Sequence, residues 1–191
     1  MNINFKKRVS EIPYHKFITG SNFANLSDIV YAEAINKVSF DKLDKNNIET
    51  YVKVEDDIFI YSIKNFTIKE NQIIFCKTDY LLDLFAKLNN VKLSNLKLIT
   101  HQAATPIIDK KLYKMKPKCI SEWYSINIGY INDKLIPIPL GLGNYFSDVG
   151  LQPTDFRNNL ISKESSRINK IFCSFDTETN PIRKKYMDFA K

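Results

Sequence analysis

Residues 73–100, IIFCKTDYLLDLFAKLNNVKLSNLKLIT, contain two short apolar runs on either side of an amphipathic segment. The runs at 73–77 and 96–100 are almost continuously apolar, which is typical of strands covered on both faces. Between them, apolar side chains recur at helical spacing, and Thr78 or Asp79 is placed to cap the helix. These side chains are Leu81, Leu84, Phe85 and Leu88. The stretch therefore predicts a strand–helix–strand unit.

The same alternation of strand-like runs and helical periodicity extends through most of the chain. We expect further strands at residues 58–63, 119–123, 135–138 and 170–175. Helices are expected after Thr105–Pro106, up to Pro117, and after Asn180–Pro181, because each pair resembles an N-cap followed by the first helical residue. The sequence thus predicts an α/β fold with a Rossmann-like, mostly parallel sheet and helices on both faces.

Residues 1–50 carry a weaker pattern. There we predict a strand at residues 16–19, a turn at Gly20 and a helix from about Phe23.

The composition describes a globular chain rather than a disordered or fibrous one. It has 191 residues, of which 44% are hydrophobic and 26% charged. Its apolar runs are much shorter than the roughly 20 residues of a membrane span, and no apolar region follows the basic residues at the start, as a secretory signal requires. We therefore expect a cytoplasmic protein in which Cys76, Cys119 and Cys173 are free thiols.

The net charge of +7 is spread along the chain without a block of five or six like charges. This pattern argues against a nucleic-acid-binding surface. A solvated, lysine-rich surface is the simplest explanation, while a positive field also favours nucleotide phosphates or peripheral contact with an anionic membrane. The charge leaves the oligomeric state open.

A polar stretch at residues 148–169 separates the last strand–helix pattern from the rest. We predict a first domain at residues 1–150, a linker at 151–169, and the first strand–helix unit of a second Rossmann-like domain at 170–191. The last helix reaches Lys191 without a capping residue, so we expect this unit to be the start of a truncated second domain.

Ligands of open α/β sheets bind beyond the carboxyl ends of the strands. His101 follows the strand at 96–100 and titrates near neutrality, which makes it a candidate general base. The helix expected at Thr105 would offer backbone N–H groups to an anion in the same loop. A histidine hydrogen-bonded locally at a strand end is the structural alternative.

Residues 121–144, SEWYSINIGYINDKLIPIPLGLGN, are rich in aromatic and amide side chains, which stack on sugar rings and hydrogen-bond to their hydroxyls. The candidates for ligand contact are Trp123, Tyr124, Asn127 and Asn144, with a place in the core as the alternative for the aromatic residues.

Proline and glycine shape the loop at residues 137–144. Pro137 and Pro139 stiffen it, and Gly141 and Gly143 then allow a tight turn or close backbone approach. The loop is not a dinucleotide-binding fingerprint, because the third glycine is missing, and it has no P-loop lysine.

Three of these segments resemble, in order, an exostosin-like group of bacterial and viral glycosyltransferases: residues 100–102 (THQ), 123–127 (WYSIN) and 134–144 (KLIPIPLGLGN). Residues 17–31 (FITGSNFANLSDIVY) and 172–186 (FCSFDTETNPIRKKY) are similar too, so the resemblance covers most of the chain. The family pattern favours Asn where Gln102 stands and often Asp where Ala104 stands, so the sequence departs from the pattern in this loop.

The resemblance implies a GT-B architecture, in which two Rossmann-like domains face each other across a cleft, with the acceptor on the first and the nucleotide-sugar on the second. This chain would form the acceptor-side part of a longer hexosyl- or pentosyltransferase of polysaccharide or glycoconjugate biosynthesis. Its partners would be a nucleotide-sugar donor and a glycan acceptor, with no metal and no further cofactor.

The resemblance also implies roles for residues. His101 would be the catalytic base, and Asn180 and Arg183 would bind the donor diphosphate. The residues expected to bind substrate are Thr100, Gln102, Trp123, Asn127, Pro139, Gly141 and Asn144.

Two other interpretations stay open. Asp176 and Glu178 form a D-x-E pair suited to a metal-dependent GT-A enzyme, although little chain follows them to build an acceptor site. A non-catalytic ligand-binding or interaction domain would keep the strand-end site without a base or a donor site.

Overall fold

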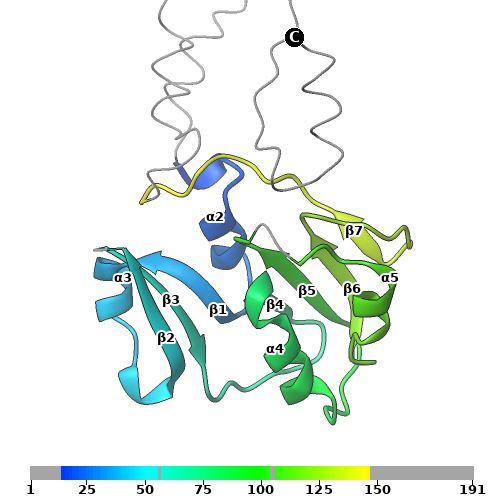
Figure 1. Ribbon diagram of the computed structural model, residues 1–191. Coiled ribbons are helices and arrows are strands. Elements are labelled where there is room, and N and C mark those ends of the chain that lie inside the picture. Colours follow the sequence, from blue (N-terminus) through cyan, green and yellow to red (C-terminus); the bar gives the residue numbers. More distant parts are fainter. Residues whose placement is uncertain (1–13, 56, 104–105, 147–191) are drawn as a thin grey trace, which may run out of the picture. The chain divides into compact units, whose positions relative to one another are not determined.

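The computed structural model describes residues 14–55, 57–103 and 106–146, all within one compact unit, Met1–Ile161. These residues form an α/β fold around a seven-stranded sheet of order β2-β3-β1-β4-β5-β6-β7 (Figure 1). The strands are β1 (Ile29–Asn36), β2 (Ile48–Glu55), β3 (Ile58–Ile63), β4 (Ile73–Lys77), β5 (Leu96–His101), β6 (Ile120–Ser125) and β7 (Leu135–Pro137). The α-helices are α2 (Gly20–Asn25), α3 (Lys37–Asp41), α4 (Leu81–Leu88) and α5 (Lys110–Lys114). Single 3-10 turns are η1 (Tyr14–Lys16), η2 (Lys45–Asn47) and η3 (Thr78–Tyr80).

The sheet is mixed but mostly parallel. β1, β4, β5, β6 and β7 run parallel to one another, whereas β3 pairs antiparallel with β1, and β2 antiparallel with β3. The prediction of an α/β fold with a mostly parallel sheet is confirmed. The antiparallel pair at one edge was not predicted.

The order of the strands creates a change of direction between β1 and β4. From β1 the chain forms β2 and β3 on one side, and it then crosses to β4 on the other side of β1. After β4 it continues in sequence order to β5, β6 and β7. In α/β sheets, loops diverge at such a point and leave room for ligands beyond the carboxyl ends of the strands.

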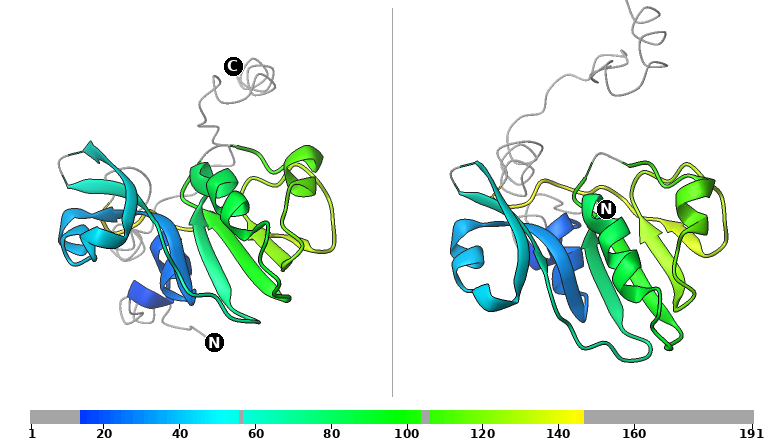
Figure 2. Two further views of the ribbon diagram at one scale, coloured as in Figure 1. Left: turned by 90° about the horizontal axis from the view of Figure 1, so that it is seen from below. Right: turned by 60° about the horizontal axis from the view of Figure 1, so that its bottom comes forward.

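Helices cover both faces of the sheet. Figure 2 shows α4 and α5 on one face, and α2 and α3 on the other. Under α4, the predicted stripe of Leu81, Leu84, Phe85 and Leu88 is buried in the main core, with Trp123 of β6. On the other face Phe40 of α3 packs in a smaller cluster with Ile35, Ile48 and Tyr61.

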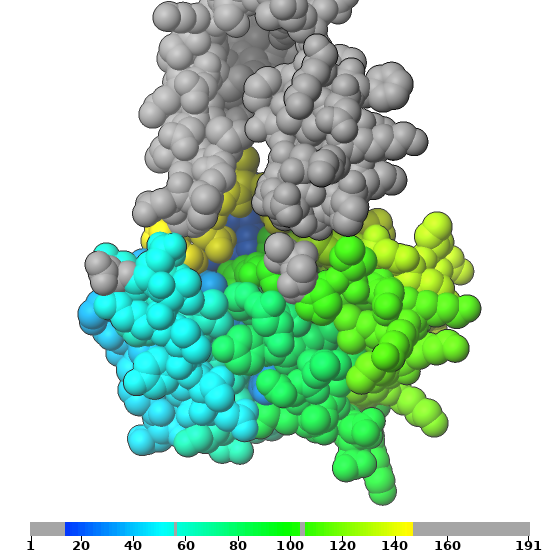
Figure 3. All heavy atoms as spheres, viewed as in Figure 1, coloured from blue at the N-terminus to red at the C-terminus, as the bar shows by residue number. Residues whose placement is uncertain are grey.

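The strands β2 and β3, at one edge of the sheet, lie beside α4 on the face of the sheet that this helix covers. In the space-filling view, residues of β2 and β3 in cyan lie beside those of β4 and α4 in green (Figure 3). Lys87 of α4 forms an ion pair with Glu49 of β2, with 2.9 Å between Nζ and Oε2. This ion pair links α4 to the edge strand β2.

The predictions for the first fifty residues were wrong. Residues 16–19 are not a strand, and Gly20 begins α2, whose N-cap is Thr19: its hydroxyl accepts the backbone N–H of Asn22 at 3.1 Å. The helix ends at Asn25, and the apolar run that follows is β1. β1 pairs with β3 on one side and β4 on the other, and these pairings outweigh the local helical spacing.

Two helix starts also differ from prediction. α5 begins at Lys110, not after Thr105–Pro106, because Ile108 is fully buried and forms a bridge with Ile128. Asp109 is its cap, accepting the N–H of Leu112 at 2.7 Å. The N-cap of α4 is Tyr80, because Thr78 lies in η3. No helix begins next to His101 in the described residues, and Thr105, where the anion site was expected, lies outside them.

Other predictions fall outside the described residues. These are Thr105, the domain and linker boundaries near 150 and 169, the strand at 170–175, and the helix from Asn180. Cys76 and Cys119 are free and buried, as predicted, while Cys173 lies outside the described residues.

Candidate functional site

The candidate site lies where β1, β4 and β5 end. Ala32 is the last residue of β1 that pairs with β4, opposite Cys76, and β4 ends one residue later, at Lys77. Lys77 is in register with His101, the last residue of β5. Glu33 is thus the first residue beyond the β1–β4 ladder, while Lys77 and His101 are the last residues of β4 and β5.

These three side chains are buried although each can carry charge. Glu33 is 9% exposed, Lys77 7% and His101 3%, and they are the buried acidic or basic side chains among the described residues. Strand alternation places all three on the face that α2 and α3 cover. The ring of His101 lies 5.4 Å from that of Phe23 in α2, and Ile35, two residues after Glu33, packs with Phe40 of α3.

The hydrogen bonding of His101 fixes its tautomer. Its Nδ1 accepts the backbone N–H of Gln102 at 2.8 Å, so in the neutral ring the proton is on Nε2. Burial lowers the pKa of His101, and the backbone of Pro139 and Leu140 opposes this shift only in part. Nε2 has no hydrogen-bond partner within the described part of the chain. At neutral pH His101 therefore has a buried Nε2–H donor that makes no well-formed hydrogen bond, and the backbone of Pro139 and Leu140 lies close enough to act on the ring.

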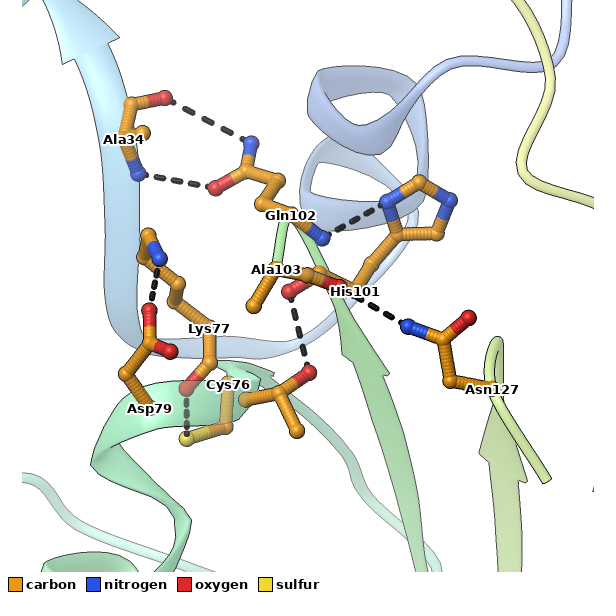
Figure 4. Close-up of polar contacts among 9 residues, drawn as sticks. Ala34, Cys76, Lys77, Asp79, His101, Gln102, Ala103 and Asn127 are labelled. Atoms are coloured by element: carbon orange, nitrogen blue, oxygen red, sulfur yellow. Dashed lines mark hydrogen bonds and ion pairs between the residues drawn. The ribbon is translucent and has the colours of Figure 1, made fainter. Parts of the chain in front are cut away.

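Gln102 joins β5 to β1 across the end of β4. Its backbone is left-handed, with φ of 60°, and its side chain extends to Ala34 (Figure 4). Oε1 accepts the N–H of Ala34 at 2.8 Å, and Nε2 donates to the carbonyl of Ala34 at 3.4 Å. The amide replaces the peptide group that β4 would supply if it continued. Gln102 therefore holds the strand ends in place.

Glu33 lies beside this bridge. Burial raises the pKa of Glu33 to about 8, and a hydrogen bond with the side chain of Gln102 acts in the opposite direction. Burial raises the pKa of Tyr61, which is opposite Glu33 on β3, and the Glu33 carboxyl group adds to this rise. Near neutral pH the carboxyl group is mostly protonated and close to its titration midpoint.

Lys77 is buried, but its ion-pair partner is partly exposed to solvent. Its ammonium forms an ion pair with Asp79 in η3, whose side chain is 45% exposed (Figure 4). Beside them, the hydroxyl of Thr78 donates to the carbonyl of His101 at 3.2 Å. The turn after β4 is therefore tied to the end of β5.

The loop at residues 137–144 crosses the N-terminus of α2. The N–H of Leu142 donates to the carbonyl of Ile18 at 2.8 Å, and Asn144 Oδ1 accepts the N–H of Ser21 at 2.9 Å. Gly141 has φ of 76°, and a Cβ there would overlap the backbone of Ile18. Asn144 and Gly141 thus fix the loop, while Pro139 is exposed at its rim.

Thr100 and Trp123 lie on the other face. Both are fully buried, and the indole N–H of Trp123 donates to Thr100 Oγ1 at 2.8 Å. Thr100 donates in turn to Ser125 Oγ at 2.7 Å. In this arrangement neither side chain has exposed surface for a ligand. Tyr124 and Glu122 are hydrogen-bonded at 2.7 Å on the partly exposed side of β6.

Asn127 is exposed at the far side of the site. It has a left-handed backbone, with φ of 54°, and its side chain donates to the carbonyl of Ala103 at 3.1 Å (Figure 4). Asn180 and Arg183 lie outside the described residues, as do Asp176 and Glu178. The described residues contain no group of three His, Cys, Asp or Glu side chains that could hold a metal ion.

Sequence reasoning missed Glu33 and Lys77. The signal for Glu33 was a single carboxylate inside the run IVYAEAI, which is informative only once residues 29–36 are known to be a strand. The signal for Lys77 was the pair Lys77 and Asp79 at the end of a correctly predicted strand.

Comparison with known proteins gives no family for the chain. It matches no protein family, no curated protein and no solved structure. Among the described residues no helix is long and apolar enough to cross a membrane.

Proposed function

We propose that this chain is the acceptor-side, Rossmann-like part of a GT-B-type glycosyltransferase, which moves a sugar from a nucleotide-sugar to a glycan acceptor. The observation that carries the proposal is the cluster of Glu33, Lys77 and His101 at the ends of three neighbouring strands, next to the change of direction between β1 and β4. A carboxyl group, an ammonium group paired with Asp79, and an imidazole are buried there at neighbouring strand ends.

The cluster suits the chemistry of sugar transfer. The acceptor hydroxyl must lose a proton, and negative charge develops on the departing diphosphate. A carboxyl group titrating near neutrality serves the first need, and Lys77 and the N–H of His101 can stabilise negative charge or bind hydroxyl oxygens. The resemblance of residues 100–102, 123–127 and 134–144 to exostosin-like enzymes supports the same reaction class.

The residues to which the resemblance gives a role in binding substrate or catalysis have different surroundings in the structure. His101 lies in the cluster, and Pro139 and Asn127 lie exposed around it. Gln102, Gly141 and Asn144 hold the strand ends and the loop, and Thr100 and Trp123 support the sheet from its other face. The donor-side residues Asn180 and Arg183 remain part of the proposal.

The alternative is a non-catalytic carbohydrate- or ligand-binding domain. The observation that favours it is that the bonding of His101 leaves no free lone pair on the ring, so that His101 itself is not arranged as a base. This domain would bind a ligand at the same strand ends and release it unchanged.

The test is a transfer assay with the full product of the gene. Radiolabelled UDP-, GDP- and dTDP-sugars are supplied with soluble oligosaccharide acceptors, and labelled oligosaccharide is measured. His101→Ala should lower the transfer rate at least tenfold, because it removes the buried donor. His15→Ala is the matched control, because His15 is the other histidine of the chain and is exposed.

The two functions give different results. Transfer that depends on His101 but not on His15 supports the glycosyltransferase. Binding of an oligosaccharide or nucleotide-sugar with no transfer or hydrolysis from any donor supports the binding domain and contradicts the proposal.

A further inference from the structure

Glu33 stands on the central strand at the point where the parallel ladder stops. The last β1–β4 pair is Ala32 with Cys76, so the side chain of Glu33 lies just beyond that ladder, on the face opposite α4. On its other side β1 remains paired with β3, where Glu33 is opposite Tyr61. Glu33 therefore lies on a strand that is held in the sheet, at the end of the sheet where ligands of α/β folds bind.

Burial of Glu33 is costly for the fold. An apolar or amide side chain of similar size would avoid the loss of hydration that a carboxylate suffers in this position. A carboxyl group kept in such a place is a candidate for function, because the same burial brings its titration into the neutral range.

The neighbouring histidine cannot supply the base without rearrangement. Nδ1 of His101 is occupied by the N–H of Gln102, and Nε2 carries the proton. To accept a proton at Nδ1 the ring would have to break that 2.8 Å hydrogen bond. The carboxyl group of Glu33 has a second oxygen and needs no such change to accept one.

We propose that Glu33 is the catalytic base that receives the proton of the acceptor hydroxyl. This inference rests on the proposed sugar transfer. The O–H bond of the acceptor breaks and its proton goes to the Glu33 carboxylate, while the acceptor oxygen forms a bond to the anomeric carbon of the donor. The bond from that carbon to the diphosphate oxygen breaks, and its electron pair leaves with the nucleoside diphosphate.

Several other ionisable side chains lie on the strands and the helix next to Glu33. Tyr61 faces it from β3, Lys77 ends β4 and pairs with Asp79, and His101 ends β5. On α3, Lys37 and Asp41 form an exposed ion pair with each other. The pKa of Tyr61 is raised and that of His101 lowered, so neither of these groups gains or loses a proton near pH 8.

The test is the pH dependence of transfer by the full product of the gene. For the wild-type protein, kcat/KM should rise with pH through an inflection near pH 8 and level off above it, as the carboxylate forms. Glu33→Gln should lower kcat by about 10²- to 10⁴-fold, the usual contribution of a general base, and should abolish the inflection. Glu55→Gln is the control, because Glu55 is exposed on β2.

The outcomes separate the inference from the proposed function. If the wild-type protein transfers sugar and Glu33→Gln keeps its rate and its inflection, Glu33 is not the base while the proposed function stands. If the wild-type protein transfers nothing from any donor, both are overturned.

A second variant guards against misfolding. Glu33→Gln should fold, because Gln has the shape of the protonated carboxyl group, and this is checked by thermal denaturation. If it does not fold, Glu33→Asp decides: moving the carboxylate back by one methylene should lower kcat at least tenfold with little change in KM. An unchanged kcat in Glu33→Asp contradicts the role as base.

Discussion

Thr100 and His101 are neighbours at the end of β5, yet they face opposite sides of the sheet and meet opposite conditions. On the α4 face, Thr100 joins Trp123 and Ser125 in a chain of hydrogen bonds that continues to the carbonyl of Ile126. On the α2 face, Nε2 of His101 has no partner among the described residues. One side of the strand completes its polar contacts, and the other leaves one donor without a well-formed hydrogen bond.

This difference separates support from function. Buried polar groups are normally hydrogen-bonded, because an unpaired one costs about 1–3 kcal/mol. The network of Thr100 and Trp123 obeys this rule and stiffens the sheet. The cluster of Glu33, Lys77 and His101 keeps a raised carboxyl pKa and an unpaired N–H, which are costs that a bound ligand can offset. The variants below test that division, in order of decreasing expected effect.

The largest effect should be on the pH dependence of stability, through Glu33. Its pKa in the folded protein, about 8, lies above its ordinary value of 4.5, so the folded state holds the proton more tightly. The contribution of Glu33 to the free energy of unfolding should therefore be largest below pH 4.5 and be lost as pH rises through about 8. The upper limit of this loss is about 5 kcal/mol, at about 1.4 kcal/mol per unit.

Urea denaturation of the wild-type protein and of Glu33→Gln between pH 4 and pH 9 measures this effect. The variant should lose most of the decline and be the more stable protein at pH 9. Parallel curves for the two proteins would show that Glu33 is not buried as described.

Trp123→Ala should be the most damaging substitution on the supporting side. The side chain is fully buried between Phe85 and Tyr113, and its loss should cost about 3–5 kcal/mol of unfolding free energy. Transfer per folded molecule should stay within twofold of wild type. It is measured without urea, at a temperature at which both proteins are folded. A folded variant with an unchanged melting temperature and no transfer would instead place Trp123 in the site.

Gly141→Ala should have the next largest effect, because it acts on the loop over α2. Gly141 has φ of 76°, and an added Cβ meets the backbone of Ile18. We expect a loss of about 1–3 kcal/mol, from backbone strain and displacement of the loop. Gly143→Ala is the matched control, as Gly143 is the next glycine along the loop. Equal melting temperatures for the two variants would argue against the contact with Ile18.

Asn144→Ala should have the smallest effect, about 1 kcal/mol, because it removes one capping contact of α2. Asn144→Asp keeps an oxygen that accepts the N–H of Ser21 and should retain the wild-type melting temperature. If Asn144→Ala keeps its melting temperature but loses acceptor binding, Asn144 contacts the substrate and is not primarily a cap.

Much of the fold was predictable where one strand or helix carries a complete pattern. β3 and β4 were placed at their observed bounds, and α4 was predicted from Leu81, Leu84, Phe85 and Leu88. β1 was missed because its boundaries depend on pairing with β3 and β4, which are distant in the sequence. Because residues 29–36 were not predicted as a strand, the face of the sheet on which Glu33 lies could not be derived.

The candidate site was only partly predictable for a related reason. The strand-end rule located His101 and the loop at 137–144, since it needs only the order of the strands. Which side chain faces a ligand depends on contacts across the sheet: Gln102 is engaged by Ala34, and Asn144 by Ser21. Those partners lie 68 and 123 residues away in sequence, so local patterns could not identify them.

A carboxyl titration of Glu33 tests the central claim most directly. Glutamate side chains are labelled with ¹³C, the Glu33 resonance is assigned by its absence in Glu33→Gln, and its shift is followed between pH 3 and pH 10. The structure predicts a midpoint near pH 8, well above the ordinary value of 4.5. A midpoint near the ordinary value of 4.5 would contradict a buried acid–base group at the end of β1.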